Sequence, residues 1–182
     1  MSLRLLNKAA QVEQDPELHM ARLLLLLNAR PQHKPVEGIM KLAKLDFLLR
    51  YPVGLERALK RVQKKPIELD IKDFERSSVE SKMIRFKYGP WDGRYRQWIG
   101  LLMAKGLAST HLEGRTVMVE LTAAGHAAAE RLAAMEEFTD TVARSLIVQK
   151  QFGNMNATKI KNFVYETFPE LVQMKWGEEI DL

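Results

Sequence analysis

The sequence predicts a mainly α-helical fold with a small β wing, a winged helix-turn-helix domain with a C-terminal helical extension. Three observations predict it. A helix with a regular apolar stripe ends at Gly106, two short strands at 107–112 and 116–121 flank a tight turn at Gly114, and Leu121-Thr122-x-x-Gly125 opens another helix. The glycine after the helix lets the chain reverse, and the threonine caps the next helix. This succession is typical of the wing end of a winged helix domain.

The helix before the wing is the best defined. Its apolar residues recur at helical spacing and predict one buried stripe, made of Tyr95, Trp98, Ile99 and Leu102. Upstream, Asp15-Pro16-Glu17 indicates a helix start, and that helix should run to about Asn28 and be buried. Residues 36–51 predict a second helix, which Pro52 and Gly54 end. We expect Lys41, Lys44 and Arg50 on its solvent side.

The remaining segments complete a single domain over residues 1–182. Its core is about 15–125, with an insertion near 53–90, and its C-terminal helices occupy 122–168. Within the insertion we expect a short basic helix at 55–62, a strand at 81–88 and a turn at 89–93. The helix from Thr122 carries apolar residues close to a coiled-coil seam, with a break expected near Thr139. The seam residues are Ala128, Leu132, Met135, Phe138, Val142 and Leu146. A last helix is expected at about 157–167.

Composition narrows the function classes. The chain has 182 residues, no cysteine and a net charge of +5. Its longest apolar run, Leu23–Leu27, is far shorter than the about 20 residues that cross a membrane, and the N-terminus lacks the shape of a signal peptide. We therefore expect a cytoplasmic protein without a membrane partner. The middle of the chain is basic and the tail acidic, which suits nucleic-acid phosphates, an acidic protein surface or simply a solvated face.

The outward face of the pre-wing helix is the main candidate site. Opposite the buried stripe lie Gln97, Gly100, Leu101 and Ala104. Only Gln97 can hydrogen-bond a base edge, whereas sequence reading requires several Arg, Asn or Gln side chains. Small residues instead let another element approach closely, so protein packing is favoured. The candidate partner-binding residues are Gly100, Leu101, Ala104, Leu132, Met135 and Phe138.

Basic residues near this helix and in the insertion are candidates for phosphate contacts. They are Arg94, Arg96, Gln97, Lys105, Arg115, Lys60, Arg61, Lys64 and Lys65. For each of them, ordinary solvation is the alternative explanation. The sequence has no Gly-rich phosphate loop, no Ser-His-Asp order and no His-Glu-x-x-His motif, and His111-Leu112-Glu113 lacks further metal ligands. We therefore expect no enzyme activity, no cofactor, no metal and no small-molecule substrate.

Three separated stretches resemble one bacterial family. The first is residues 38–52, with Lys41-Leu42-x-Lys44-Leu45-Asp46-Phe47-Leu48-Leu49-Arg50-Tyr51-Pro52. The second is Tyr88-Gly89-Pro90-Trp91-Asp92-x-Arg94-Tyr95, followed by Lys105-Gly106-Leu107 and Leu121-Thr122-x-x-Gly125. The third is residues 156–170, with Gly177-x-x-Ile180 after it. Over most of residues 15–180 the chain resembles the middle component of bacterial ABC-three-component systems, which include the Lamassu-type antiphage defence systems.

The resemblance implies a non-catalytic adaptor subunit. It would link an SMC-like or RecF-like ATPase, which senses foreign DNA, to an effector that is often a nuclease, and it could touch double-stranded DNA without reading its sequence. No catalytic residues carry over from the family. The alternative is a winged-helix DNA-binding transcription regulator that dimerises through the helix at 122–151. A nucleic-acid-processing enzyme is a third and weaker alternative.

Overall fold

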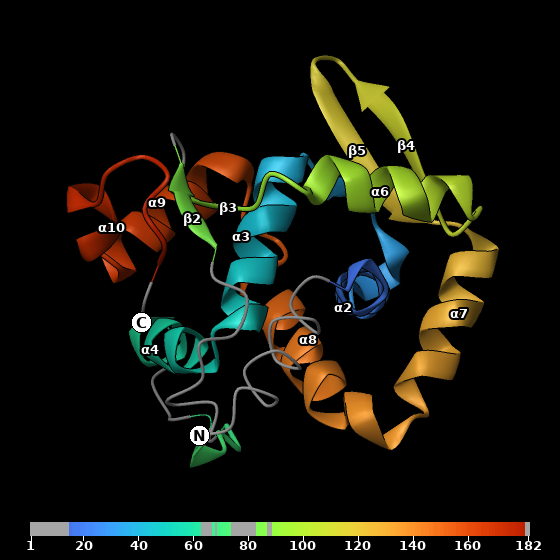
Figure 1. The fold of residues 1–182 in the computed structure, drawn as a ribbon, viewed down its shortest axis with the longest axis horizontal. Coiled ribbons are helices and arrows are strands. Elements are labelled where there is room, and N and C mark those ends of the chain that lie inside the picture. Colours follow the sequence, from blue (N-terminus) through green and yellow to red (C-terminus); the bar gives the residue numbers. More distant parts are fainter. Residues whose placement is uncertain (1–14, 63–66, 68, 74–82, 87–88, 181–182) are drawn as a thin grey trace.

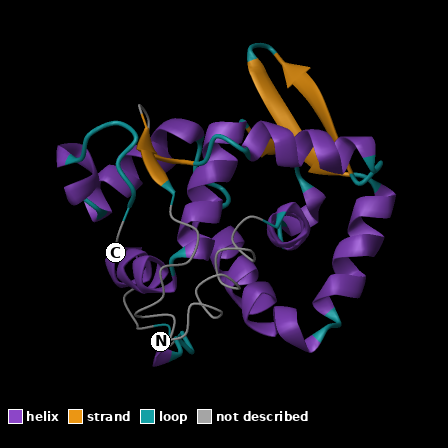
Figure 2. Ribbon diagram, in the orientation of Figure 1, coloured by secondary structure: helices purple, strands orange, loops and turns teal. Residues whose placement is uncertain are grey.

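The protein is mainly helical with a small antiparallel sheet, as Figures 1 and 2 show for the computed structural model. The structure describes residues 15–62, 67, 69–73, 83–86 and 89–180. Over these residues, the helices are too short or too polar for a membrane crossing.

Helix α2 (Pro16–Asn28) forms the centre of the fold. Asp15 caps it, since its Oδ1 accepts a hydrogen bond from the Glu17 amide at 2.8 Å. Figure 1 shows α2 end-on among its neighbours, and its apolar residues from Leu23 to Leu27 are all buried. The predicted bounds and the predicted burial of this helix are confirmed. A short 3-10 turn, η1 (Pro31–His33), follows.

The second predicted helix begins later than expected. Val36–Glu37 is strand β1, and helix α3 spans Ile39–Arg50. Gly38, with φ of 92°, makes the bend between them, in a region that side chains disfavour. The prediction that Lys41, Lys44 and Arg50 face solvent is wrong, because all three are buried. Contacts with α8, α9 and β3 leave α3 no free side.

The insertion between α3 and the wing forms a helix and a hairpin. Pro52 begins helix α4 (Pro52–Val62) and does not merely end α3, because proline is well tolerated in a first helical turn. Strands β2 (Ile84–Phe86) and β3 (Gly89–Trp91) then pair antiparallel. The prediction of a turn over 89–93 is therefore wrong for its first three residues.

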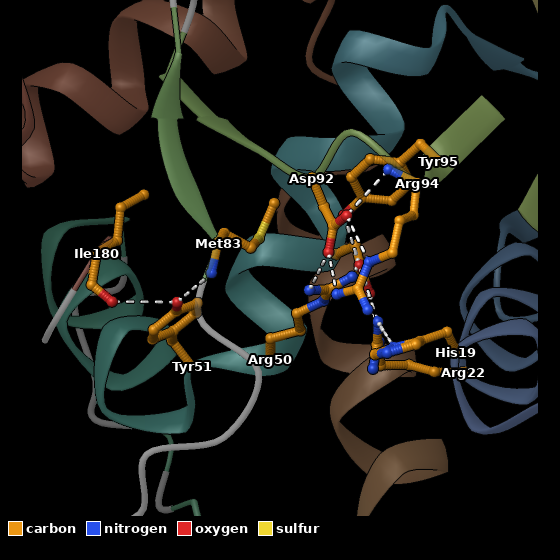
Figure 3. A network of polar contacts seen from close by, with 10 residues as sticks. His19, Arg22, Arg50, Tyr51, Met83, Asp92, Arg94, Tyr95 and Ile180 are labelled. Carbon is orange, nitrogen blue, oxygen red and sulfur yellow. Dashed lines mark hydrogen bonds and ion pairs between the residues drawn. The ribbon is translucent and has the colours of Figure 1, made fainter. Parts of the chain in front are cut away.

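The last described residues continue this small sheet. The amide of Arg85 donates to the carbonyl oxygen of Glu178 at 2.8 Å, and the amide of Ile180 donates to that of Met83 at 2.8 Å. The Tyr51 hydroxyl connects both sides, accepting from the Met83 amide at 2.8 Å and donating to the Ile180 oxygen at 3.2 Å (Figure 3). The C-terminal segment is thereby attached to the insertion.

The two strands expected after the pre-wing helix form an antiparallel hairpin. Helix α6 (Tyr95–Ala104) leads into strands β4 (Ala108–Glu113) and β5 (Thr116–Leu121), and β1 adds to β5, giving the order β1-β5-β4. The Thr122 hydroxyl accepts from the Gly125 amide at 3.0 Å, which caps the next helix. At Gly125 a Cβ would lie 1.9 Å from the carbonyl oxygen of Leu107, so only glycine allows this close approach.

The long helix expected after the wing is divided in two. Helix α7 (Ala123–Ala133) and helix α8 (Thr139–Phe152) meet at an angle around η2 (Glu136–Phe138), as Figure 1 shows. The expected break is present, but the continuous seam is not, since Met135 and Leu146 are exposed. Helix α9 (Ala157–Thr167) has its predicted bounds, and the short α10 (Glu170–Gln173) follows.

Candidate interaction surface

A buried carboxylate fixes the position of α6. Asp46 has a fully buried side chain and accepts hydrogen bonds from Arg22 Nε at 2.7 Å and Arg50 Nε at 2.9 Å. The Tyr95 hydroxyl, in the first turn of α6, donates to Asp46 Oδ2 at 2.5 Å. Figure 3 shows Arg22, Arg50 and Tyr95 converging between the helices. One carboxylate therefore joins α2, α3 and α6.

A second carboxylate, Asp92, extends this network to the start of α6. It accepts from Arg94 Nη2 at 2.8 Å and from the Arg94 amide at 3.0 Å, and it pairs with Arg50 Nη1 at 3.2 Å. The guanidinium groups of Arg94 and Arg50 lie 5.0 and 5.2 Å from the centre of the Trp98 ring. Arg94 is thus engaged by its own chain, which argues against the phosphate contact predicted for it.

The network keeps fixed charges at neutral pH. Burial by itself would raise the pKa of Asp46, but Arg22 and Arg50 hold that pKa well below its usual range. Burial likewise opposes ionisation of Asp92, and hydrogen bonds from Arg94 together with the charge of Arg50 lower its pKa to about 2. Burial and the neighbouring Asp46 raise the pKa of Tyr95 well above 10. These groups therefore position the helix and do not exchange protons near pH 7.

Sequence reasoning missed this network. The available signals were an aspartate inside an otherwise apolar helix, an arginine four residues later, and the Asp92-x-Arg94-Tyr95 motif. A charged residue on an apolar face requires a partner, and the four-residue spacing places Arg50 beside Asp46. The partners on α2 and α6 depend on tertiary packing.

The face of α6 opposite its buried stripe is exposed and carries mostly small side chains. Gln97, Gly100 and Ala104 are exposed, Met103 is 42% exposed, and Leu101 is partly buried against the core. A Cβ added at Gly100 would meet nothing within 4 Å. The predicted stripe and the outward positions of Gln97, Gly100 and Ala104 are confirmed. Leu101, which was also predicted to face outward, instead packs partly against the core. The exposed surface could accept a closely packed partner element.

Three of the predicted phosphate-binding residues lie in α6, directly after it, and in the β4–β5 turn. Arg96, Lys105 and Arg115 are exposed, and none of them forms an ion pair within the described residues. Arg96 lies in the first turn of α6, Lys105 just after it and Arg115 at the wing turn. The β4–β5 hairpin projects beyond α6 in Figure 1.

The basic residues of α4 lie elsewhere and have partners within the chain. Lys60 pairs with Glu56 at 3.2 Å, and Arg61 pairs with Glu166 of α9 at 2.9 Å. Arg57 pairs with Glu170 of α10 at 2.5 Å. These ion pairs therefore neutralise part of the positive charge in the middle of the chain and part of the negative charge in its tail. Lys64 and Lys65 lie outside the described residues.

The structure separates the two predicted groups of partner-binding residues. Leu132, Met135 and Phe138 lie at the junction of α7 and α8, whereas Gly100 and Ala104 lie near the other end of α7. Leu132 and Phe138 are partly buried, and Met135 is 44% exposed. They do not form one surface.

A cleft of about 340 Å³ lies between the wing and the start of α9. Its lining combines Glu37 and Glu113 with the polar side chains of Thr116, Asn156 and Thr158. Across the part of the chain that the structure describes, His, Asp and Glu side chains do not gather in threes in a way that could hold a metal ion.

Comparison of the chain with protein-family models, with curated proteins and with solved structures gives no match.

Proposed function

We propose that this chain is a winged helix-turn-helix domain that acts as a non-catalytic adaptor, docking a partner protein on the outward face of α6. The order of elements supports the fold. Helix α2, strand β1, helix α3, helix α6 and the β4–β5 hairpin follow one another as in a winged helix domain, with α4, β2 and β3 inserted before α6. Pairing of β1 with β5 also agrees with that fold.

The observation that carries the proposal is the chemistry of the outward face of α6. In DNA-binding winged helix domains this helix enters the major groove and carries side chains that read base edges. Here it presents Gly100 and Ala104, and Arg94 is bound to Asp92. Small residues permit close approach of another helix or strand, and Met103 adds exposed apolar surface.

The partners that we propose follow from the family resemblance. An SMC-like or RecF-like ATPase would occupy the α6 face, and the chain would connect it to an effector in an antiphage defence complex. Arg96, Lys105 and Arg115 would contact phosphates of double-stranded DNA held by the complex. Such contacts position the protein and do not select a sequence.

The test uses two substitutions at one position. Gly100→Arg places a long side chain on the face, and Gly100→Ala serves as the matched control, because open space at this position lets both fold. We expect Gly100→Arg to weaken co-purification with an SMC-like or RecF-like ATPase encoded beside this chain by at least about tenfold, while Gly100→Ala retains it. The added positive charge should leave DNA affinity unchanged or raise it.

A different result would favour the alternative function, a DNA-binding transcription regulator. If the purified chain alone binds one promoter sequence tightly as a dimer, with a steep salt dependence, the adaptor proposal is wrong. The division of 122–151 into α7 and α8 already removes the continuous helix through which the regulator was expected to dimerise. Unchanged ATPase binding by Gly100→Arg would place the docking surface away from α6.

A further inference from the structure

Strand β4 is an open edge of the wing sheet. The strand order is β1-β5-β4, and within the described residues β4 pairs with β5 alone. The pairing runs residue by residue from Ala108 opposite Leu121 to Glu113 opposite Thr116, so no bulge interrupts this hairpin. Figure 1 shows the tip of the hairpin projecting beyond α6. The backbone groups of β4 that point away from β5 therefore have no strand partner in the described part of the chain.

A hydrogen bond at the base of the hairpin shows which residues of β4 point outward. The Thr122 amide donates to the carbonyl oxygen of Leu107 at 3.1 Å, which places Leu107 in the series that bonds toward β5. Residues of an antiparallel strand alternate between bonding to the neighbouring strand and pointing away from it. Thr110 and Leu112 belong to the second series, so their N–H and C=O groups point to the open edge.

The pairing on the other side of β5 agrees with this alternation. Val117 stands opposite Leu112, and its carbonyl oxygen accepts a hydrogen bond from the Gly38 amide at 2.9 Å, on the β1 side. The backbone of Val117 therefore points away from Leu112, as the alternation requires. Leu112 is 71% exposed and Thr110 is half-buried, so another chain can reach this part of the edge.

The reachable part of this edge lacks the features that usually prevent strand addition. Proteins protect an open edge with lysine, proline, a bulge or an inward-pointing charge. From Thr110 to Leu112 the strand has no lysine, proline or bulge, and its outermost apolar side chain is exposed. The Thr110 hydroxyl donates to Met103 Sδ at 3.7 Å, so the exposed Met103 of α6 borders the same edge.

We propose that the outer edge of β4 binds an extended segment of a partner protein, which adds to the wing sheet as a further strand. The backbone of the segment would bond to Thr110 and Leu112, and apolar side chains on one of its sides would contact Leu112 and Met103. Lys105 precedes β4 and Arg115 follows it, both exposed, so a segment with acidic ends fits best. The inference rests on the proposed adaptor function and gives the partner a second contact beside the α6 face.

The experiment follows amide hydrogen exchange of the full chain by NMR while a synthetic peptide is added. The probe is the acetylated and amidated peptide Glu-Val-Thr-Val-Thr-Val-Glu, and its matched control has lysine at both ends. In the free chain, the amides of Ser109 and His111 should exchange slowly and those of Thr110 and Leu112 fast. The probe should slow exchange at Thr110 and Leu112 at least about tenfold with a saturable dependence, and the lysine peptide should bind more weakly.

A proline at the open edge removes one outward amide and leaves the bonds to β5 in place, which is why edge strands tolerate it. Thr110→Pro should therefore weaken binding of the probe at least about tenfold, whereas Thr110→Val keeps the amide and should retain binding. If Thr110→Pro folds poorly, Leu112→Glu at an exposed position should give a similar loss, because it removes the apolar contact and repels the acidic probe.

The outcomes separate this site from its alternatives. Unchanged exchange at Thr110 and Leu112, or binding that Thr110→Pro does not weaken, would overturn the edge site. Protection of the same two amides that grows with protein concentration, without peptide, would make a second copy of this chain the occupant and overturn the partner segment. The experiment contains no ATPase, so failure of the edge site leaves the Gly100→Arg test of the adaptor function independent.

Discussion

Two buried charges on α3 have opposite surroundings. Asp46 receives hydrogen bonds from two arginines and a tyrosine, and these partners hold it ionised. Lys44, two residues earlier, has one carbonyl oxygen and a neighbouring lysine. A folded chain tolerates buried charges when opposite charges and hydrogen bonds compensate them. The first site is therefore satisfied within the chain, whereas the Lys44 ammonium has a single hydrogen-bond acceptor among the described residues.

The largest expected effect comes from breaking the compensated site. Asp46→Ala would leave Arg22 and Arg50 buried without their carboxylate and free the Tyr95 hydroxyl. We expect the free energy of unfolding to fall by roughly 3–5 kcal/mol. Urea denaturation monitored by circular dichroism measures it. A loss below about 1 kcal/mol would mean that the arginines find other partners or water.

The uncompensated site should give a pH dependence in the alkaline range. The pKa of Lys44 is about 8 in the folded chain and 10.5 in the unfolded chain, so the unfolded state holds this proton more tightly. Stability should therefore rise between pH 7 and 9.5, by about 2 kcal/mol for this group. Denaturation curves in phosphate-free buffer measure the rise. Lys44→Met should lack this component, and an identical pH profile for both proteins would contradict the assignment.

A small substitution on the exposed face of α6 tests whether this face is open while the opposite face is packed against the core. Gly100→Ala should raise the free energy of unfolding by roughly 0.5–1 kcal/mol, because alanine loses less backbone entropy than glycine in a helix. Thermal unfolding measures this change. A destabilised Gly100→Ala would show that the α6 face is packed more tightly than its open surroundings indicate.

The exposed ion pair of α4 should have the smallest effect. Arg61 and Glu166 pair at 2.9 Å with about half of each side chain or more exposed to solvent. Arg61→Ala should lower the free energy of unfolding by less than about 1 kcal/mol at low salt, and by less in 1 M salt. Urea denaturation at the two salt concentrations makes the comparison. A larger loss that salt does not reduce would point to packing by the arginine stem.

Part of this fold was predictable because its signals are local. Asp15 and Thr122 cap their helices as expected, since a side chain that bonds its own backbone needs no distant partner. The buried stripe from Tyr95 to Leu102 was equally predictable, because helical spacing alone shows which side of the helix is apolar. The candidate surface on α6 was therefore predictable as the face opposite that stripe. The engagement of Arg61 by Glu166 was not, because this contact depends on how α4 and α9 pack.

The sequence alone determined the bounds of α2 and α9, the position of the β4–β5 hairpin, and which residues of α6 turn inward. Only the tertiary structure decided that the charged residues of α3 are buried and which groups surround them. A charged residue in a sequence indicates a solvent-exposed side, but α8, α9 and β3 pack around α3 and leave it none. Burial then depends on which elements meet there. The same packing places Arg22 of α2 beside Asp46 and Lys161 of α9 near Lys44.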